Sequence, residues 1–119
     1  MRRELFAGLN VDLYPRRNFR AGDVVLGDGT STDRLLIIID GRIGAGAGCK
    51  ALGSGDLIKP VEFFGALSYD GDARACSAGK VAIVPREAVR ACLEAQGAIT
   101  WSLACAIAIE AIAAAREMA

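Results

Sequence analysis

A single arginine, Arg74, lies near the end of a stretch whose residue types suit the binding of an anion. Residues 60–78 are consistent with one turn of helix followed by a loop that ends at Arg74. Exposed backbone amides and a helix dipole favour negative charge, and a guanidinium adds a forked donor. The pattern predicts an anion site. The alternative is a connecting loop that carries a solvated arginine.

Catalytic and metal-binding chemistry is disfavoured because the chain contains no histidine. Zinc hydrolases, cupin-type metal sites and Ser-His or Cys-His catalytic groups depend on imidazole. We therefore expect a non-catalytic protein with no metal ligands and no resident cofactor. The four cysteines form no C-x-x-C pair and are expected to be reduced structural thiols: Cys49, Cys76, Cys92 and Cys105. The alternative is an oxidation role for Cys76, whose pKa the nearby Arg74 would lower.

The composition is that of one globular domain. The 119 residues are 53% hydrophobic and 24% charged, which suits a chain that buries a core. Fourteen basic residues balance fourteen acidic ones, so we expect no direct binding to nucleic acid. The only membrane candidate, residues 99–115, is short and contains Glu110, which favours a packed helix without membrane contact. The N-terminus has no secretory signal, so we expect a cytoplasmic protein.

Residues 11–84 have the rhythm of a small antiparallel barrel or sandwich. Runs rich in Val, Ile and Leu are separated by glycine and aspartate clusters. The expected strands are residues 11–14, 23–26, 35–40, 42–47, 50–52, 57–58 and 81–84. The pair Asp40-Gly41 predicts a hairpin. Residues 1–10 are expected to form a short amphipathic helix.

A glycine motif, Gly46-Ala47-Gly48-Cys49-Lys50-Ala51, fits the G-x-G-x-x-A pattern of a dinucleotide-binding loop. Such a loop must open a helix, whereas Gly53-Ser54-Gly55 follows almost at once. We therefore predict a hairpin at this motif.

Residues 85–119 change to helical periodicity. Pro85 suits a first helical position, and Gly97 ends the first helix. Residues 98–119 predict a second helix with apolar residues on several faces. A single small barrel cannot cover all of this apolar surface. We expect this second helix to form the interface of a dimer.

Two segments, residues 18–29 and 33–43, resemble the opening of the cyclic-nucleotide-binding domain found in catabolite activator-type (CRP/FNR) regulators, kinase regulatory subunits and gated channels. They keep the family order of an aromatic residue, Gly-Asp, apolar positions, a glycine, an aspartate and an apolar strand before a glycine. Residues 52–58 resemble the family's next turn, and residues 81–119 its closing strand and paired C-terminal helices. The resemblance spans nearly all of residues 1–119. It implies one mainly β domain, an antiparallel β-roll (a double-stranded β-helix, jelly-roll-like) with a short N-terminal helix and two C-terminal helices.

The resemblance also implies roles in a phosphate-binding cassette. In the family, an Arg followed by a small residue pairs with the cyclic phosphate, and Arg74-Ala75 matches that pair. A preceding Gly-Glu supplies a carboxylate for the ribose hydroxyl. When Gly65 is aligned with that glycine, Ala66 stands where the glutamate belongs. Alternatively Glu62 serves as the ribose contact, with a longer loop to Arg74.

Contacts to the base of such a ligand would come from the second helix. Thr100 and Ser102 could reach a purine by hydrogen bond, and Trp101 and Tyr69 could stack on it. The alternative is that these side chains belong to the core or to an interface.

The function implied is that of an effector-sensing module of a transcription regulator. A cyclic nucleotide or another small anionic ligand, held by Arg74 and the amides near Gly65 and Ala66, would shift the second helix and thereby a homodimer or partner. The alternative is a ligand-free interaction module that dimerises with itself or with a related regulator. CRP-type regulators continue into a helix-turn-helix segment, whereas this sequence stops at Ala119, so DNA binding is not expected of it.

Overall fold

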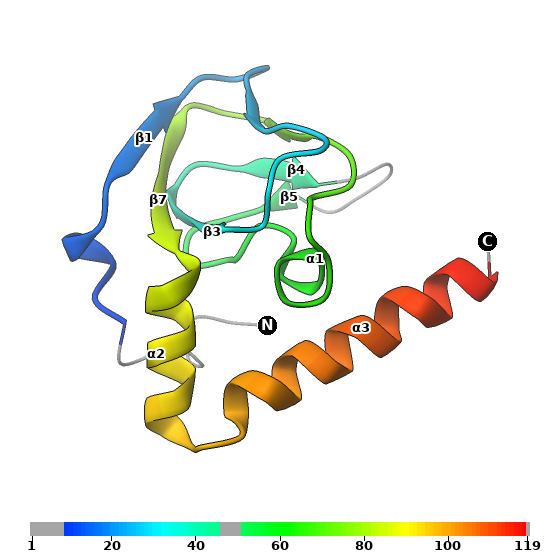
Figure 1. Cartoon of the computed structure of the whole chain (residues 1–119). Helices are drawn as coiled ribbons and strands as arrows, with labels where there is room; N and C mark the ends of the chain where they lie inside the picture. Colours follow the sequence, from blue (N-terminus) through cyan, green and yellow to red (C-terminus); the bar gives the residue numbers. More distant parts are fainter. Residues whose placement is uncertain (1–8, 46–50, 119) are drawn as a thin grey trace.

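The computed structural model describes residues 9–45 and 51–118 (Figure 1). In chain order, the elements of that part of the chain are η2 (Val11–Leu13), β1 (Arg16–Phe19), β2 (Val24–Leu26), β3 (Arg34–Asp40), β4 (Ile43–Ala45), β5 (Ala51–Leu52), α1 (Pro60–Gly65), β6 (Ala73–Ala75), β7 (Gly79–Pro85), α2 (Arg86–Gln96) and α3 (Thr100–Met118). The helix expected over residues 1–10 falls almost wholly outside the described residues.

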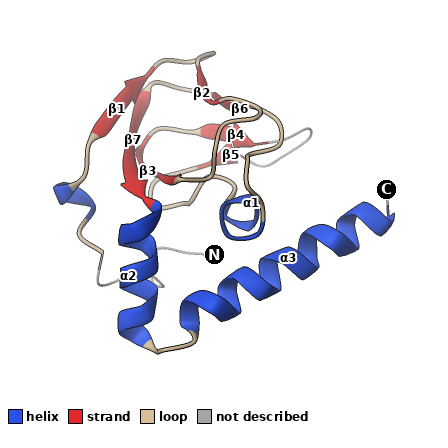
Figure 2. Cartoon of the chain, in the orientation of Figure 1, coloured by secondary structure: helices blue, strands red, loops and turns tan. Residues whose placement is uncertain are grey.

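The strands form two antiparallel sheets that pack as a β-roll (Figure 2). One sheet has the order β1-β7-β3, and the other has the order β2-β6-β4-β5. The pairings of β1 with β7, β2 with β6, β3 with β7, and β4 with β5 and β6 are all antiparallel. The mainly β, antiparallel roll with C-terminal helices that the sequence predicts is therefore confirmed.

The centre of the core is the β3–β7 pair. Four successive residues of β3, 35–38, are buried, so both faces of the strand are covered. Because both faces are buried, the sequence of β3 is a continuous apolar run. A strand with one solvent-exposed face would alternate apolar and polar residues. In the register of the pair, Leu36 lies opposite Ile83 and Ile38 lies opposite Val81.

Several expected local structures in the first half of the chain are wrong. Residues 11–13 form the 3-10 turn η2 in place of the expected strand 11–14, because the Asn10 side chain accepts the Asp12 N–H at 3.1 Å and caps the turn. Residues 57–58 make only an isolated bridge, Ile37 to Leu57. Asp40-Gly41 does not close a hairpin, because β3 pairs with β7 while β4 pairs with β5 and β6 in the other sheet.

The glycine motif at residues 46–51 lies between two paired strands. β4 and β5 run antiparallel, with Ile43 opposite Leu52 and Gly44 opposite Ala51. This pairing agrees with the hairpin prediction and not with a dinucleotide loop, which would precede a helix. The residues that connect these two strands, 46–50, lie outside the described residues.

The helical prediction for the C-terminal third is confirmed to within two residues. Pro85 is the N-cap of α2, and Gly97 is its C-cap. α3 begins at Thr100 and crosses below α1 in Figure 1. Within the described residues, no single helix is long and apolar enough to span a membrane. α2 and α3 taken together reach the required length and composition, but they meet at a bend of 115°.

The short helix α1 is held between the sheets and α3 (Figure 1). Its Phe63 and Phe64 are buried and meet Trp101 of α3, with ring centroids 6.3 Å and 5.6 Å from the indole. Gly65 permits a close approach, because a Cβ there would lie 2.8 Å from the carbonyl carbon of Ala108. The last residue of α1 therefore touches the backbone of α3.

Candidate functional site

Arg74 and Ala75 line a cavity of about 460 Å³ formed by β6, β4 and the loop after α1. Arg74 is the middle residue of β6 and lies opposite Val24 of β2 and Gly44 of β4. Its neighbours Ala73 and Ala75 are buried, whereas the Arg74 side chain is 62% exposed. The alternation of the strand thus sends the guanidinium away from the core. The other lining residues are Gly44, Lys59, Asp70, Gly71, Asp72 and Cys76.

The Arg74 guanidinium already has an acidic neighbour in this cavity. Asp72 Oδ2 lies 3.6 Å from Arg74 Nη2. Asp72 is oriented by the backbone N–H of Asp28, which donates to Asp72 Oδ1 at 2.8 Å. Exposed ion pairs of this kind contribute little, about 0–1 kcal/mol. An anionic ligand could therefore compete with Asp72 for Arg74.

A second cation, Lys59, fixes the loop on the other side of the cavity. Lys59 is the N-cap of α1 and has a left-handed backbone, with φ 48°. Its Nζ donates to the carbonyl oxygens of Asp70 and Gly71, the latter at 2.8 Å. Gly71 has φ +81°, and a Cβ there would stand 3.3 Å from Lys59 Nζ. Glycine is thus required at residue 71 for the turn that Lys59 holds.

The loop that carries Asp70 and Asp72 is bonded along its length to residues 28–32. Backbone hydrogen bonds join Gly29 N–H to Tyr69 O and Tyr69 N–H to Thr30 O, each at 2.8 Å. The Asp28 carboxylate accepts the Gly71 N–H at 2.7 Å. These bonds order the loop without a ligand, so binding would cost little additional conformational entropy.

Gly65, Ala66 and Glu62, the other cassette residues expected from the sequence, do not line the Arg74 cavity. The Ala66 N–H donates to Glu62 O at 2.9 Å, and the Ala66 carbonyl accepts the Thr32 hydroxyl at 2.6 Å. Both backbone groups of Ala66 are therefore already used. Glu62 is half-buried on α1, and its charge helps to raise the pKa of Tyr69.

The residues expected to contact a base lie elsewhere. Thr100 is the first residue of α3, and its N–H donates to Gly97 O at 3.1 Å. Ser102 is exposed on α3, and neither residue lines the Arg74 cavity. Trp101 and Tyr69 belong to the core, with exposed fractions of 8% and 1%. The core alternative for these two aromatic residues is confirmed.

Tyr69 is part of the connection between the cassette loop and β3. Its hydroxyl donates to the carbonyl oxygen of Arg34 at 2.6 Å. Burial raises the pKa of Tyr69 well above its ordinary value, against the opposing effect of the Arg86 guanidinium. Tyr69 is accordingly a neutral structural donor throughout the ordinary pH range.

The cysteines of the described residues are free thiols in three different environments. Cys76 is exposed and lines the Arg74 cavity, whereas Cys92 and Cys105 are half-buried beside the core. Burial raises the pKa of the Cys105 thiol, although Arg86 and Arg90 act in the opposite direction. Cys49 lies outside the described residues.

Among the residues the structure describes, no group of three or more His, Cys, Asp or Glu side chains is placed to hold a metal ion.

Sequence reasoning missed four charged residues of this site: Lys59, Asp70 and Asp72, which line it, and Asp28, which holds its loop. The charged turn Asp70-Gly71-Asp72, immediately before Arg74, was an available signal for a tight loop rich in carboxylates. Nothing in the sequence marks Lys59, because its position depends on the left-handed backbone before Pro60. The pairing of Asp28 with this loop spans more than forty residues and arises only in the folded chain.

Solved structures of low sequence identity share the fold. A transcriptional regulator from Thermotoga maritima has a TM-score of 0.60 and 16% identity, over 91% of this chain and 90% of that chain. An EAL enzyme in its cGMP-bound form has a TM-score of 0.66 and 14% identity, over 87% of this chain and 30% of that chain. The regulatory subunit of a cAMP-independent protein kinase A from Trypanosoma brucei has a TM-score of 0.62 and 22% identity, over 76% and 37%.

No curated protein sequence is significantly similar to this chain. Residues 16–96, however, match the family described as the cyclic nucleotide-binding domain. This match covers well over half of the chain and includes both sheets, α1 and α2. The chain therefore belongs to the family of cyclic nucleotide-binding domains.

Proposed function

We propose that the chain is a non-catalytic regulatory module that binds a cyclic nucleotide, or another small organic anion, in the cavity at Arg74. One observation carries this proposal: the Arg74 guanidinium projects from a short central strand into a cavity of about 460 Å³ whose loop is already ordered. Cavities of this size suit small ligands. A guanidinium on a strand presents a forked, permanently charged donor to phosphate oxygens.

The charges of the cavity determine what a ligand must do. Two cations, Lys59 and Arg74, are matched by two carboxylates, Asp70 and Asp72. A cyclic phosphate would displace Asp72 from Arg74, while the side chain at residue 66 offers no acceptor for a ribose hydroxyl. An unmet hydroxyl contact costs about 1–3 kcal/mol, which is roughly tenfold to a hundredfold in affinity. We therefore expect weaker binding than in family members that keep the glutamate.

Ligand binding would be transmitted through α1 to α3. α1 follows Lys59 directly, and Gly65 at its other end touches the α3 backbone at Ala108. Trp101 of α3 packs edge-on against Phe63 and Phe64 of α1. A ligand that binds one arrangement of α1 better than another would shift the position of α3 by that difference in affinity.

Calorimetric titration of the whole chain with cAMP and with cGMP tests the proposal. Saturable binding that Arg74→Ala weakens by about tenfold to a hundredfold, and that Arg116→Ala leaves unchanged, is the expected result. Arg116 is the matched control because it is exposed near the end of α3 and lines no cavity described above. The proposal would be overturned if neither cAMP nor cGMP binds, or if the Arg74→Ala variant binds as tightly as the parent chain.

A second candidate function, a homodimer or interaction module without a ligand, is favoured by the outer face of α3. Ile99, which immediately precedes α3, is followed at four-residue steps by Leu103 and Ile107 of the helix, and the three are 70%, 53% and 61% exposed. This spacing places them in one row along the helix. A row of large apolar side chains at a helix surface favours association with a second copy of this chain or a related regulator.

Sedimentation velocity distinguishes this second function. A dimer of the unmodified chain that Leu103→Glu converts to monomer, while Ser102→Glu does not, is expected if α3 is the interface. Ser102 is the control because it is exposed one residue away on a different side of the helix. A monomeric wild-type chain at tens of micromolar concentration would contradict self-association through α3.

A further inference from the structure

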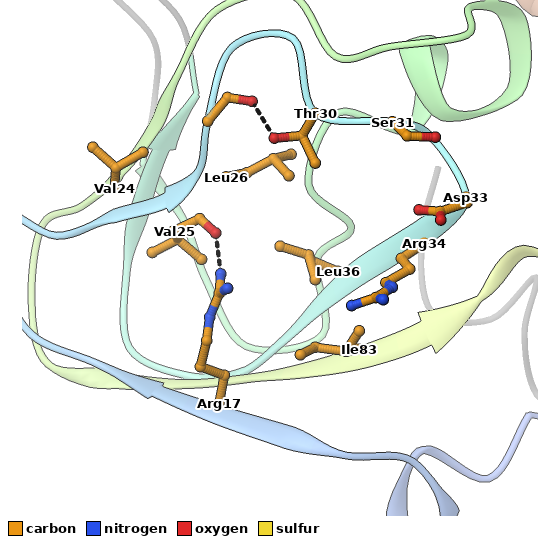
Figure 3. A pocket seen from close by; sticks show the side chains of 11 residues that line it. Arg17, Val24, Val25, Leu26, Thr30, Ser31, Asp33, Arg34, Leu36 and Ile83 are labelled. Carbon is orange, nitrogen blue, oxygen red and sulfur yellow. Dashed lines mark hydrogen bonds between the residues drawn. The ribbon is translucent and has the colours of Figure 1, made fainter.

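A second cavity, of about 380 Å³, lies between β2 and the sheet β1-β7-β3 (Figure 3). It shares no lining residue with the Arg74 cavity. Two arginines from different strands, Arg17 of β1 and Arg34 of β3, line it. Neither was expected from the sequence to take part in a site.

The strand register explains how two arginines come to line one space between the sheets. Leu36 lies opposite Ile83, and Arg17 lies opposite Val81. Directly paired residues of antiparallel strands point to the same face, and so do residues two apart on one strand. Arg17, Arg34, Leu36 and Ile83 therefore share one face of the sheet, and β2 lies over that face.

The charges at this cavity do not balance. Two guanidiniums face one carboxylate, that of Asp33. Arg17 donates one hydrogen bond to the carbonyl oxygen of Val25, as Figure 3 shows. The other N–H groups of its guanidinium remain available to a ligand. The Arg34 guanidinium has no hydrogen-bond or ion-pair partner among the described residues. An excess of positive charge with unused donors is what an anionic group would neutralise.

The backbone that carries these groups is fixed. The Arg34 carbonyl accepts the buried Tyr69 hydroxyl at 2.6 Å, and Arg34 lies opposite Pro85 in the sheet. Thr30, on the rim, donates its hydroxyl to Gly27 O at 2.7 Å. Side chains on such rigid elements hold a ligand more precisely than side chains on free loops.

The floor of the cavity is apolar. Val25 and Leu36 are 4% and 5% exposed, and Ile83 is half-buried. Figure 3 shows Leu36 and Ile83 between the two arginine side chains. An apolar body attached to an anionic head would lie on this floor, where the body itself is removed from water.

We propose that this cavity is a second ligand site, which takes a small organic anion: an apolar body on Val25, Leu36 and Ile83, with a carboxylate or phosphate head held by Arg34 and Arg17. The site is independent of the Arg74 cavity. It requires no chemical step, only the pairing of the head group with the guanidiniums and the removal of apolar surface from water.

Amide chemical-shift titration of the whole chain by NMR tests this site, with benzoate and phenyl phosphate as probes. We expect saturable shifts at residues 24–26 and 30–34, and about tenfold or more weaker binding of the probe in Arg34→Gln. Arg34→Gln is the principal variant because its guanidinium has no partner to lose among the described residues. Arg17→Lys keeps the positive charge but loses the paired N–H donors of the guanidinium, so it should weaken binding less than Arg34→Gln does.

Controls separate this site from the Arg74 cavity and separate the two kinds of head group. Arg74→Ala should leave these shifts unchanged, and so should Arg116→Ala. Acetate, which has no apolar body, and benzyl alcohol, which has no charge, should each bind at least tenfold more weakly than benzoate. If only phenyl phosphate binds, the head group is a phosphate, and if only benzoate binds, it is a carboxylate. Shifts that fail to saturate with either probe, or that persist unchanged in Arg34→Gln, would overturn the proposal.

Discussion

Gly65 and Ala108 are in backbone contact: a Cβ on Gly65 would lie 2.8 Å from the carbonyl carbon of Ala108 and 2.9 Å from the next amide nitrogen. The contact joins the last residue of α1 to the middle of α3, and it leaves no room for a side chain. Packed interiors do not deform continuously. A displacement of α1 by a ligand would therefore have to be accompanied by a displacement of α3.

Gly65→Ala should destabilise the fold by about 1–3 kcal/mol, because the added methyl group forces α1 and α3 apart. Urea unfolding followed by circular dichroism measures this change. Gly53→Ala is the matched control, since a Cβ on Gly53 would meet nothing within 4 Å. We expect the control to lie within about 0.5 kcal/mol of the parent. Equal stability of the two variants would show that α3 is not seated on α1 in solution.

Arg86→Met should destabilise the fold by about 2–4 kcal/mol. The Arg86 guanidinium lies 4.9 Å from the ring centroids of both Phe63 and Trp101, and it donates to the carbonyl oxygens of Phe63 at 2.6 Å and Thr32 at 3.1 Å. Methionine fills space but leaves these carbonyls without their donor. Trp101 is the only tryptophan, so its emission during denaturant unfolding reports on this contact directly.

Arg90→Met provides the comparison for Arg86. Arg90 also lies over Trp101, but at 6.0 Å, and its other contact is an exposed ion pair with Glu94 at 3.3 Å. We expect less than about 1 kcal/mol of destabilisation. If the two substitutions cost the same, the hydrogen bonds of Arg86 to α1 do not contribute, and Arg86 is not what joins α2 to α1.

Elements with a strong periodic signal could be predicted from the sequence, and elements defined by their neighbours could not. β3 has a buried apolar run, and α2 has Pro85 and Gly97 at its ends, so each was expected close to its true bounds. β6 is only Ala73–Ala75, with no β-branched residue, and it is a strand because β2 and β4 flank it. β1 was missed for a similar reason, since three of its four residues are exposed.

In the candidate sites, too, the residues with a local sequence signal could be predicted, and those placed by their neighbours in the fold could not. Arg74 could be singled out because it is an isolated cation after a helical turn, whereas its neighbours Lys59 and Asp72 reach the cavity through loop geometry. Arg17 was not expected to take part in any site. The register with β7 places it at the edge of a cavity between the sheets. Spacing along the chain does not contain this information, because register depends on strand pairing.

Alkaline pH should destabilise the protein through Tyr69. Burial raises the pKa of Tyr69 in the folded state above the value of about 10 that it has when unfolded. The unfolded chain therefore loses this proton first as pH rises, and the free energy of unfolding falls with pH above about 10. Below that pH the contribution is fully present.

Unfolding in urea between pH 8 and pH 11.5, for the parent and for Tyr69→Phe, measures the effect. Tyr69→Phe should be less stable near neutral pH, because it loses the hydrogen bond to Arg34 O, and its stability should fall less steeply above pH 10. The raised pKa of the Cys105 thiol acts in the same direction but is common to both proteins. Parallel pH profiles of the two proteins would contradict a buried, neutral Tyr69.

Asp72→Asn should strengthen the binding of an anion at Arg74. The substitution removes the negative charge 3.6 Å from the guanidinium but keeps an oxygen that can accept the Asp28 N–H, so the loop should hold its shape. Because the pair is exposed, removal of the competing charge should be worth only a fewfold to about tenfold in affinity. The gain should shrink in high salt, which screens exposed charges.

Calorimetry with cAMP at two salt concentrations measures this gain. Asp70→Asn is the comparison, because Asp70 lines the same cavity but makes no ion pair with Arg74 in the described structure. If Asp72→Asn and Asp70→Asn have equal effects, only the overall charge of the cavity matters, and the pairing of Asp72 with Arg74 has no separate role. If Asp72→Asn weakens binding, Asp72 is a ligand contact and not a competitor, which would make it the acceptor for a ribose hydroxyl that Ala66 cannot be.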